Sequence, residues 1–365
     1  MKTVYLDRLA RAAEETASQD LDALVVSPSR DLAYLTGYDP MPLPRPTLLV
    51  LRPHRDPVML VPELERALAE ASPLGDHLGL MPWRDGSDPF EAAASVLAGV
   101  ERIAVADRLW ASHLLGLQRE LPDAAFSPAS SVMVRLRAVK DEHELGALRR
   151  AGRAADETFR QVVSMSFQGR SEEDVAHDLA ELLVGNGHDR AEFTIVASGP
   201  NAASPHHEPG GRTILPRDAV VMDFGGQLGG YFSDTTRTVV VGDPPEGFEH
   251  AYAAVQEAQA AAVEAVRPGL EAEEVDRTAR TIVDAAGYGE RFIHRTGHGI
   301  GLDLHEPPYM VEGDRTVLEP GMTFSVEPGV YLEGRFGIRI EDIVAVTADG
   351  VERLNRSTRE LQVVS

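Results

Sequence analysis

The sequence has no cysteine among its 365 residues, which excludes disulfide bonds, thiolate metal sites and a cysteine nucleophile. It also has no apolar run approaching the roughly 18 residues that span a bilayer, so we expect no membrane partner. Residues 1–20 carry mixed charges and no continuous apolar stretch, a pattern typical of an amphipathic helix rather than a secretory signal. These absences fit a cytoplasmic protein, and we predict that location.

Basic residues are in deficit, since 35 Lys and Arg stand against 58 Asp and Glu and give a formal net charge of −23. Proteins that bind nucleic acid duplexes usually show the opposite sign, so we expect no nucleic acid partner. The acidic excess is explained by solubility, and a second interpretation is that bound cations neutralise some of the carboxylates.

The length exceeds one ordinary compact core, so two domains are expected. Helix and strand patterns alternate through the first third of the chain, which predicts an α/β domain over residues 1–130. A stretch rich in Ser, Pro and Ala indicates a connection, and we place a linker at 131–140. The strands of the first domain are expected at 21–27, 47–51, 57–61 and 102–106, and its helices at 5–19, 89–100 and 112–121.

A second domain is predicted at 141–365, where Asp141 with Glu144 resembles a capping box before a long amphipathic helix. Two units of helix, helix and strand follow one another, which predicts an internally duplicated α+β domain. Its helices are expected at 141–164, 171–184, 247–267 and 271–286, and its strands at 193–198, 219–224, 322–332 and 337–347.

The first candidate site is a glycine-rich hairpin that brings Asp223 and Asp234 near each other. Like charges that face each other across a sheet are destabilising, so such a pair usually has a compensating cation. Two solvated aspartates are the alternative if this hairpin is considered alone.

The second candidate site repeats this arrangement with Glu327 and Glu341, which lie at equal distances from Gly334. A symmetric hairpin makes the two glutamates direct cross-strand neighbours, and the apolar residues around them predict a buried setting. A buried carboxylate pair must share protons or bind metal. Two such pairs in one domain argue strongly against two merely solvated faces.

A third element, Gly-His-Gly-Ile-Gly-Leu at 297–302, offers His298 as a fifth ligand, and its glycines allow a close approach of the backbone. We leave His294 as a structural residue because the His-Glu-x-x-His pattern is absent. Four carboxylates and one imidazole suit Mn²⁺ or Co²⁺ and tolerate Zn²⁺. Bridging carboxylates hold two metals about 3.5–4 Å apart, which predicts metal-assisted hydrolysis.

Four motifs of the second domain resemble the creatinase/methionine aminopeptidase "pita-bread" metallopeptidase family. Within it, they are similar to the branch of Xaa-Pro dipeptidases (prolidases) and aminopeptidase P. The resemblance covers the chain from about residue 140 onward, and the first third resembles the creatinase-like domain only in architecture. The motifs are Gly-Tyr-Phe-Ser-Asp-Thr-Thr-Arg-Thr at 230–238, Gly-His-Gly-Ile-Gly-Leu at 297–302, Ser-Val-Glu-Pro-Gly at 325–329 and Ile-Arg-Ile-Glu-Asp at 338–342.

The resemblance implies a two-metal peptidase, and Mn²⁺ is the expected metal. Asp234 and Glu341 would bridge the metals, and Glu327 would also shuttle the proton of the attacking water. It further implies a homodimer and a small peptide substrate with proline in second position. The ligands so implied are Asp223, Asp234, His298, Glu327 and Glu341.

Further residues are expected around these ligands. The resemblance makes His206 a substrate-side histidine, and His305 a contact of the scissile amide that steadies the tetrahedral intermediate. Arg339 lies two residues before Glu341 and so faces the same side of a strand, where it would support the carboxylates or the substrate. Tyr231 either contacts ligand or is a buried structural tyrosine. His207, next to His206, should point elsewhere.

The choice between dipeptides and longer peptides depends on the first domain. Arg45 lies in a proline-rich loop, and its guanidinium would bind the carboxylate of a dipeptide through two hydrogen bonds. A surface arginine held between prolines is the alternative. A dipeptidase is therefore our first prediction, and aminopeptidase P the second.

Other members of the fold fit less well. Methionine aminopeptidases usually lack a preceding domain of this size, and creatinase-type amidinohydrolases work without metals. Non-enzymatic binding proteins of the fold often lose ligands, whereas this chain keeps all five. A storage or structural metal protein would not need the extra histidines and arginine.

Overall fold

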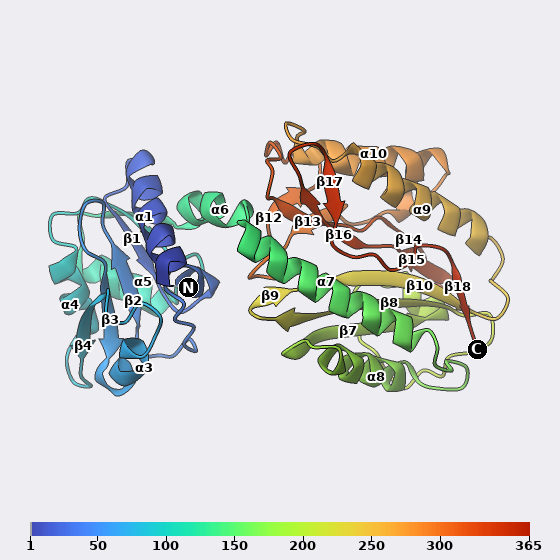
Figure 1. The fold of residues 1–365 in the computed structure, drawn as a ribbon, viewed down its shortest axis with the longest axis horizontal. Helices are drawn as coiled ribbons and strands as arrows, with labels where there is room; N and C mark the ends of the chain where they lie inside the picture. The colour runs from blue at the N-terminus through green and yellow to red at the C-terminus, as the bar shows by residue number, and fades with distance from the viewer. Residues whose placement is uncertain (1) are drawn as a thin grey trace. The chain divides into compact units, whose positions relative to one another are not determined.

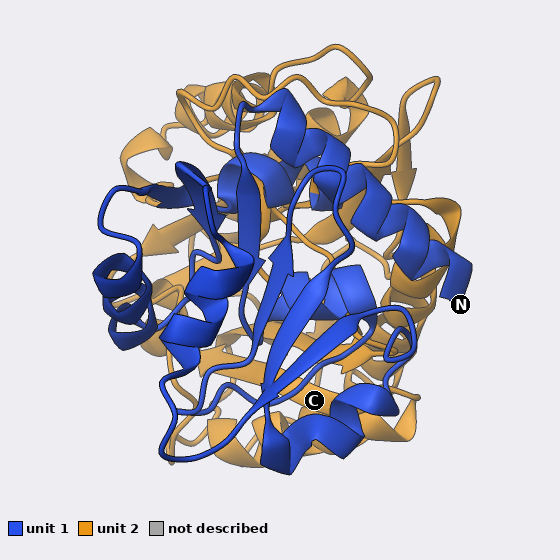
Figure 2. Cartoon of the chain, turned by 90° about the vertical axis from the view of Figure 1, so that its left-hand side faces the viewer, with its two compact units in different colours: residues 1–137 blue, residues 138–365 orange. Residues whose placement is uncertain are grey.

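The computed structural model describes residues 2–365, which divide into two compact units, Met1–Arg137 and Ala138–Ser365 (Figures 1 and 2). No helix in residues 2–365 is long and apolar enough to cross a membrane.

The N-terminal unit contains one sheet of six strands in the order β4-β3-β2-β1-β5-β6. The central strand β1 pairs with β2 in antiparallel and with β5 in parallel orientation. Apolar side chains of these strands and of α4 and α5 form the core. The strands are β1 Ala23–Val26, β2 Leu48–Leu51, β3 Val58–Pro62, β4 Gly79–Trp83, β5 Arg102–Val105 and β6 Ala125–Pro128; the helices are α1 Lys2–Ser18, α2 Arg30–Thr36, α3 Arg66–Glu70, α4 Pro89–Val96, α5 Ala111–Glu120 and α6 Ser130–Ala138.

The predicted α/β class of this unit is confirmed, and its four predicted strands are present as β1, β2, β3 and β5. Strands β4 and β6 were not predicted. Both lie at an edge of the sheet and are only partly buried, so they lack the apolar pattern of a central strand. The residues predicted as a linker, 131–140, are mostly helical because they belong to α6, whose Val132, Met133 and Leu136 are buried.

The C-terminal unit contains two larger sheets and a hairpin. One sheet has the order β18-β10-β8-β7 with β9 beside β8, the other has the order β12-β11-β13-β16-β17, and β14 pairs with β15. Strands of these sheets are β7 Arg190–Ser198, β8 Ala219–Leu228, β9 Tyr231–Phe232, β10 Thr235–Val241, β11 Gly297–Gly299, β12 Glu306–Met310, β13 Thr323–Val326, β14 Gly329–Leu332, β15 Phe336–Arg339, β16 Asp342–Val346, β17 Val351–Arg353 and β18 Gln362–Val364.

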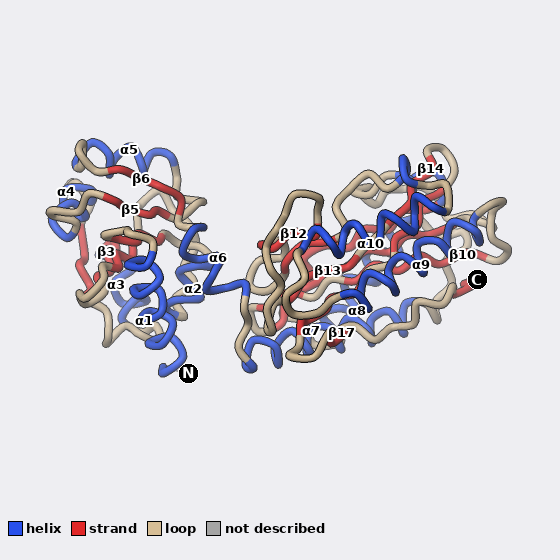
Figure 3. Tube along the Cα trace, turned by 90° about the horizontal axis from the view of Figure 1, so that it is seen from above, coloured by secondary structure: helices blue, strands red, loops and turns tan. Residues whose placement is uncertain are grey.

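Four long helices lie along these strands in Figure 3: α7 (Glu142–Val162), α8 (Glu172–Gly185), α9 (Phe248–Ala265) and α10 (Ala272–Ala285). Helices α7 and α8 pack on β7 and β8, whereas α9 and α10 pack on β12, β13 and β15. The predicted capping box starts α7, because Asp141 accepts from the Glu144 amide at 2.8 Å and Glu144 accepts from the Asp141 amide at 3.0 Å.

The predicted duplication is visible in the backbone hydrogen bonds. The Gly169 amide donates to the Ile214 carbonyl at 2.9 Å, and the Gly269 amide donates to the Leu318 carbonyl at the same distance. The Ile214 amide in turn donates to the Arg170 carbonyl at 2.8 Å, and the Leu318 amide donates to the Leu270 carbonyl at the same distance. The two helix-helix-strand units therefore share one local fold.

Candidate metal centre

Asp223 and Asp234 come from the first sheet. Asp223 on β8 pairs with Thr236 on β10, and Asp234 precedes Thr236 by two residues, so both side chains face the same side. Both aspartates are buried. The hairpin predicted from the glycine-rich sequence thus brings the two carboxylates together, in a diagonal rather than a direct pairing.

Glu327 and Glu341 lie where one hairpin passes from one sheet to another. The register is centred on Gly334 as predicted, because Val326 pairs with Asp342 and Gly329 pairs with Arg339. We expected the two glutamates to be direct cross-strand neighbours. The ladder is interrupted between these pairs, so they are not direct ladder partners. The Glu327 amide donates to the carbonyl of Thr296 at 2.7 Å, and the Glu341 amide donates to that of Thr236 at 3.0 Å.

His298 reaches the carboxylates from the short strand β11. A Cβ atom on Gly297 would lie 1.8 Å from the Ser325 carbonyl oxygen, so only glycine allows β11 to approach β13 this closely. The Nε2 atom of His298 lies 3.4 Å from Glu327 Oε1 and 3.6 Å from Asp234 Oδ2. Burial lowers the pKa of His298 to about 3, so its imidazole is neutral and can coordinate a metal.

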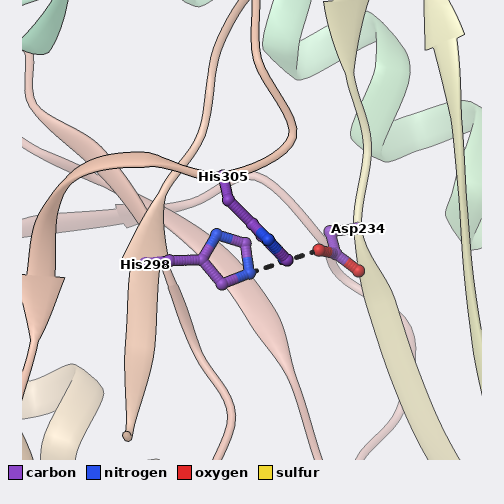
Figure 4. A group of neighbouring side chains, drawn as sticks. All are labelled: Asp234, His298 and His305. Atoms are coloured by element: carbon purple, nitrogen blue, oxygen red, sulfur yellow. Dashed lines mark ion pairs between the residues drawn. The ribbon is translucent and has the colours of Figure 1, made fainter. Parts of the chain in front are cut away.

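These five side chains and His305 form three overlapping groups, and within each group the ligand atoms lie within 4.8 Å of one another. Figure 4 shows one of them, in which His298 and His305 point toward Asp234. Within residues 2–365, Asp223 Oδ1 and Glu341 Oε1 are buried without a hydrogen-bond partner. The groups are Asp234, His298 and His305; His298, Glu327 and Glu341; and Asp223, Asp234 and Glu341.

The electrostatics of the cluster favour bound cations. Burial raises the pKa of Asp234 and of Glu341 well above the usual range, and the neighbouring carboxylates add to this. Burial also raises the pKa of Glu327 to about 7. Buried carboxylates with unpartnered oxygens, set beside a neutral imidazole, fit divalent metal ions, which supply the missing positive charge.

Hydrogen-bonding side chains orient the carboxylates. Arg339 donates to Asp223 Oδ2 at 2.5 Å and to the Tyr331 hydroxyl at 2.8 Å. Thr236 Oγ1 donates to Glu341 Oε2 at 2.6 Å, and Ser325 Oγ donates to Glu327 Oε1 at 3.0 Å.

Thr236, Ser325 and Tyr331 were missed by the sequence reasoning. Ser325 precedes a ligand by two residues and Thr236 follows one by two, so the alternation of side chains along a strand could have found both. Tyr331 offered no such signal, because its contact with Arg339 depends on the fold of the β14–β15 hairpin.

Two of the predicted substrate-side histidines lie by the cluster. The ring centres of His305 and His298 are 4.0 Å apart. Burial lowers the pKa of His305, and the nearby Arg295 and His206 lower it further. The His206 side chain is exposed. The ring of His294, predicted to be structural, lies 2.8 Å from the Tyr331 hydroxyl and 2.7 Å from the Arg295 carbonyl.

Tyr231 and Arg45 have other partners. The Tyr231 hydroxyl donates to Glu144 Oε1 at 2.9 Å, and its ring packs in a buried cluster with Leu148 and Ile300. Of the two roles left open for Tyr231, this geometry favours the structural one. Arg45 forms a two-pronged ion pair with Asp85 within the N-terminal unit, at 2.8 and 2.7 Å.

The fold and the cluster together define a metallopeptidase. Residues 146–348 match Metallopeptidase family M24, and residues 8–139 match the Creatinase/Prolidase N-terminal domain. The chain belongs to the M24 family.

Relatives cover both units. The chain is 46% identical over 364 residues to the probable dipeptidase PepE of Mycobacterium tuberculosis, which covers 99% of this chain and 97% of that protein. It is 37% identical over 371 residues to the Xaa-Pro dipeptidase of Lactobacillus helveticus, with 98% of each chain covered.

Solved structures give the same result. The dipeptidase PepE from Mycobacterium ulcerans superposes with a TM-score of 0.96 at 44% identity, covering 100% of this chain and 98% of that one. The prolidase from Thermococcus sibiricus superposes with a TM-score of 0.91 at 36% identity, covering 98% of each chain. The predicted family and the two-domain fold are therefore confirmed.

Proposed function

We propose that the protein is an Xaa-Pro dipeptidase, which hydrolyses the bond before the proline of a dipeptide. The observation that carries this proposal is the convergence of five largely buried ligand side chains, with the exposed His305 beside His298. The names of the relatives support the substrate, since one is an Xaa-Pro dipeptidase and one solved structure is a prolidase.

The ligands in this proposal are the ones predicted from the sequence. Two divalent ions would bind a water molecule and lower its pKa toward neutrality, which supplies hydroxide at physiological pH. Glu327 holds the proton released by this water at its carboxylate and passes it to the leaving proline nitrogen, which has no proton of its own. His206 and His305 donate hydrogen bonds to the substrate as negative charge develops, and Arg339 keeps Asp223 oriented.

Manganese is the metal we propose, with Co²⁺ and Zn²⁺ as alternatives, because four carboxylates and one imidazole form an oxygen-rich set. The homodimer, the cytoplasmic location and the domain bounds 1–130, 131–140 and 141–365 stay predictions of the sequence.

Metal-stripped protein is expected to hydrolyse Leu-Pro only after Mn²⁺ is added, and to leave Leu-Pro-Xaa tripeptides largely uncleaved. Release of leucine from both peptides, with and without Mn²⁺, measures this. Cleavage chiefly of the tripeptide would instead identify an aminopeptidase P. Metal uptake without cleavage of either peptide would contradict a proline-specific peptidase and favour a binding protein of the same fold.

Arg45 is proposed to select dipeptides, although its guanidinium is engaged by Asp85. A substrate carboxylate must displace Asp85 or share the guanidinium with it. On this proposal Arg45→Ala lowers the ratio of dipeptide to tripeptide cleavage, while Asp85→Asn keeps or raises it. An unchanged ratio in Arg45→Ala reduces Arg45 to a surface residue held between prolines.

A further inference from the structure

The segment between β7 and β8 carries His206, yet His206 does not fix its own position. Within residues 2–365, its side chain has no hydrogen bond and no ion pair, and it is exposed. The segment begins with a short 3₁₀ helix, η2 (Gly199–Ala203), and ends in a turn in which the His207 amide donates to the Ser204 carbonyl at 3.2 Å. The position of His206 must therefore be set by its neighbours.

One buried carboxylate holds most of this segment. Glu172, the first residue of α8, has a side-chain exposure of 0%. Its Oε1 accepts from the Ser198 amide and hydroxyl, both at 2.7 Å, and its Oε2 lies 2.8 Å from His207 Nε2. Asn201 donates to both oxygens at 3.1 Å. Burial acts to raise the pKa of Glu172, but these hydrogen bonds outweigh it and hold the pKa below the usual range.

The other side of the segment is held by the metal-site hairpin. Arg339 Nη1 donates to the Pro205 carbonyl at 3.4 Å. A Cβ atom on Gly337 would lie 1.8 Å from the Ala202 carbonyl oxygen, so η2 lies directly against β15. The residue before His206 is thus tethered by Arg339, and the residue after it by Glu172.

We propose that Glu172 is a positioning residue for His206 and acts through His207, Asn201 and Ser198. The proposal rests on the dipeptidase function proposed above, in which His206 meets the substrate. Fixing an exposed histidine in this way removes the entropy cost of orienting it when substrate binds. It also gives His207 a defined role, that of a link between the carboxylate and the turn.

The second copy of the duplicated unit has no glutamate at the position of Glu172. The Glu172 amide donates to the Arg212 carbonyl at 3.1 Å, and in the second copy the Ala272 amide donates to the Thr316 carbonyl at 2.9 Å. Ala272 thus occupies the place of Glu172 at the start of α10. In that copy Asp276 of α10 accepts from the Thr296 amide at 3.0 Å and from the Thr296 hydroxyl at 2.7 Å, as Glu172 does from Ser198. Glu172 differs because it also binds Asn201 and His207, in the segment that carries His206.

The test compares Glu172→Gln with Glu173→Gln, a neighbouring exposed glutamate, in the Mn²⁺-loaded full chain. Glu172→Gln is expected to lower kcat/KM for Leu-Pro about 10- to 100-fold, mainly through kcat and without loss of bound metal. His207→Ala should lower it in the same direction, and Glu173→Gln should leave it unchanged. In a His206→Ala background, adding Glu172→Gln should lower kcat/KM by a further factor of less than about three, because the residue that Glu172 positions is gone.

Hydrogen–deuterium exchange provides a readout that does not depend on activity. The amides of residues 199–207 should exchange faster in Glu172→Gln than in wild type or Glu173→Gln. Unchanged exchange there would overturn the proposal, and so would an equal loss of activity with and without His206. If wild type cleaves neither peptide, the proposed function fails, while the exchange experiment still decides whether Glu172 holds the segment.

Discussion

Glu327→Gln is expected to lower kcat for Leu-Pro by about 10²- to 10⁴-fold while the protein stays folded, because the amide cannot take up a proton. In the metal-free protein, burial raises the pKa of Glu327 to about 7. Bound cations favour its ionised form, which is the form that accepts the proton of the attacking water. Its Oε1 lies 3.4 Å from His298 Nε2 and accepts a hydrogen bond from Ser325. An amide of the same shape retains these contacts but not the charge.

Glu333→Gln is the matched control, because Glu333 is an exposed glutamate of the same hairpin. Steady-state kinetics with Mn²⁺ in excess, together with the metal content of each variant, separates loss of the proton shuttle from loss of the metal. Full metal content with a tenth or more of wild-type kcat in Glu327→Gln would contradict the role proposed for Glu327.

The five predicted ligands lie together in the structure, and the sequence could indicate this because each carboxylate pair is local. Each carboxylate pair belongs to one hairpin, and the register of the second hairpin follows from Gly334, whose φ of 72° suits the turn. The duplication is also readable, since its helices carry a 3.6-residue apolar pattern. Central strands such as β1 are found because they are short, continuous apolar runs, and all four residues of β1 are buried.

Contacts between distant segments are not readable in this way. Arg45, which precedes β2, meets Asp85, which follows β4, and nothing in either neighbourhood indicates this partner. Glu172 resembles an ordinary glutamate in the first turn of a helix. Only the contacts of α8 with the end of β7 and with the residues after η2 give it Ser198 and His207 as partners. Such roles depend on tertiary contacts, which local patterns do not specify.

The metal-free protein is expected to lose stability as the pH rises, and bound Mn²⁺ should reverse that trend. Burial raises the pKa of Glu327 from 4.5 to about 7, so the folded protein holds this proton more tightly than the unfolded chain does. The stabilisation is complete below pH 4.5 and is lost as the pH rises through 7. The shift corresponds to about 3 kcal/mol of unfolding free energy.

Bound metal reverses the pH dependence of stability. It requires ionised carboxylates, so its affinity increases as the carboxyl groups lose their protons. At a free concentration of one hundred times Kd, it adds about 2.7 kcal/mol to the free energy of unfolding. Urea unfolding between pH 5 and 8, with chelator or with Mn²⁺, measures both slopes. Glu327→Gln removes one titrating group. Without metal, the unfolding free energy of this variant should therefore fall less steeply with pH than that of the wild type. Equal slopes in the variant and the wild type would show that this carboxylate is ionised in the folded metal-free protein.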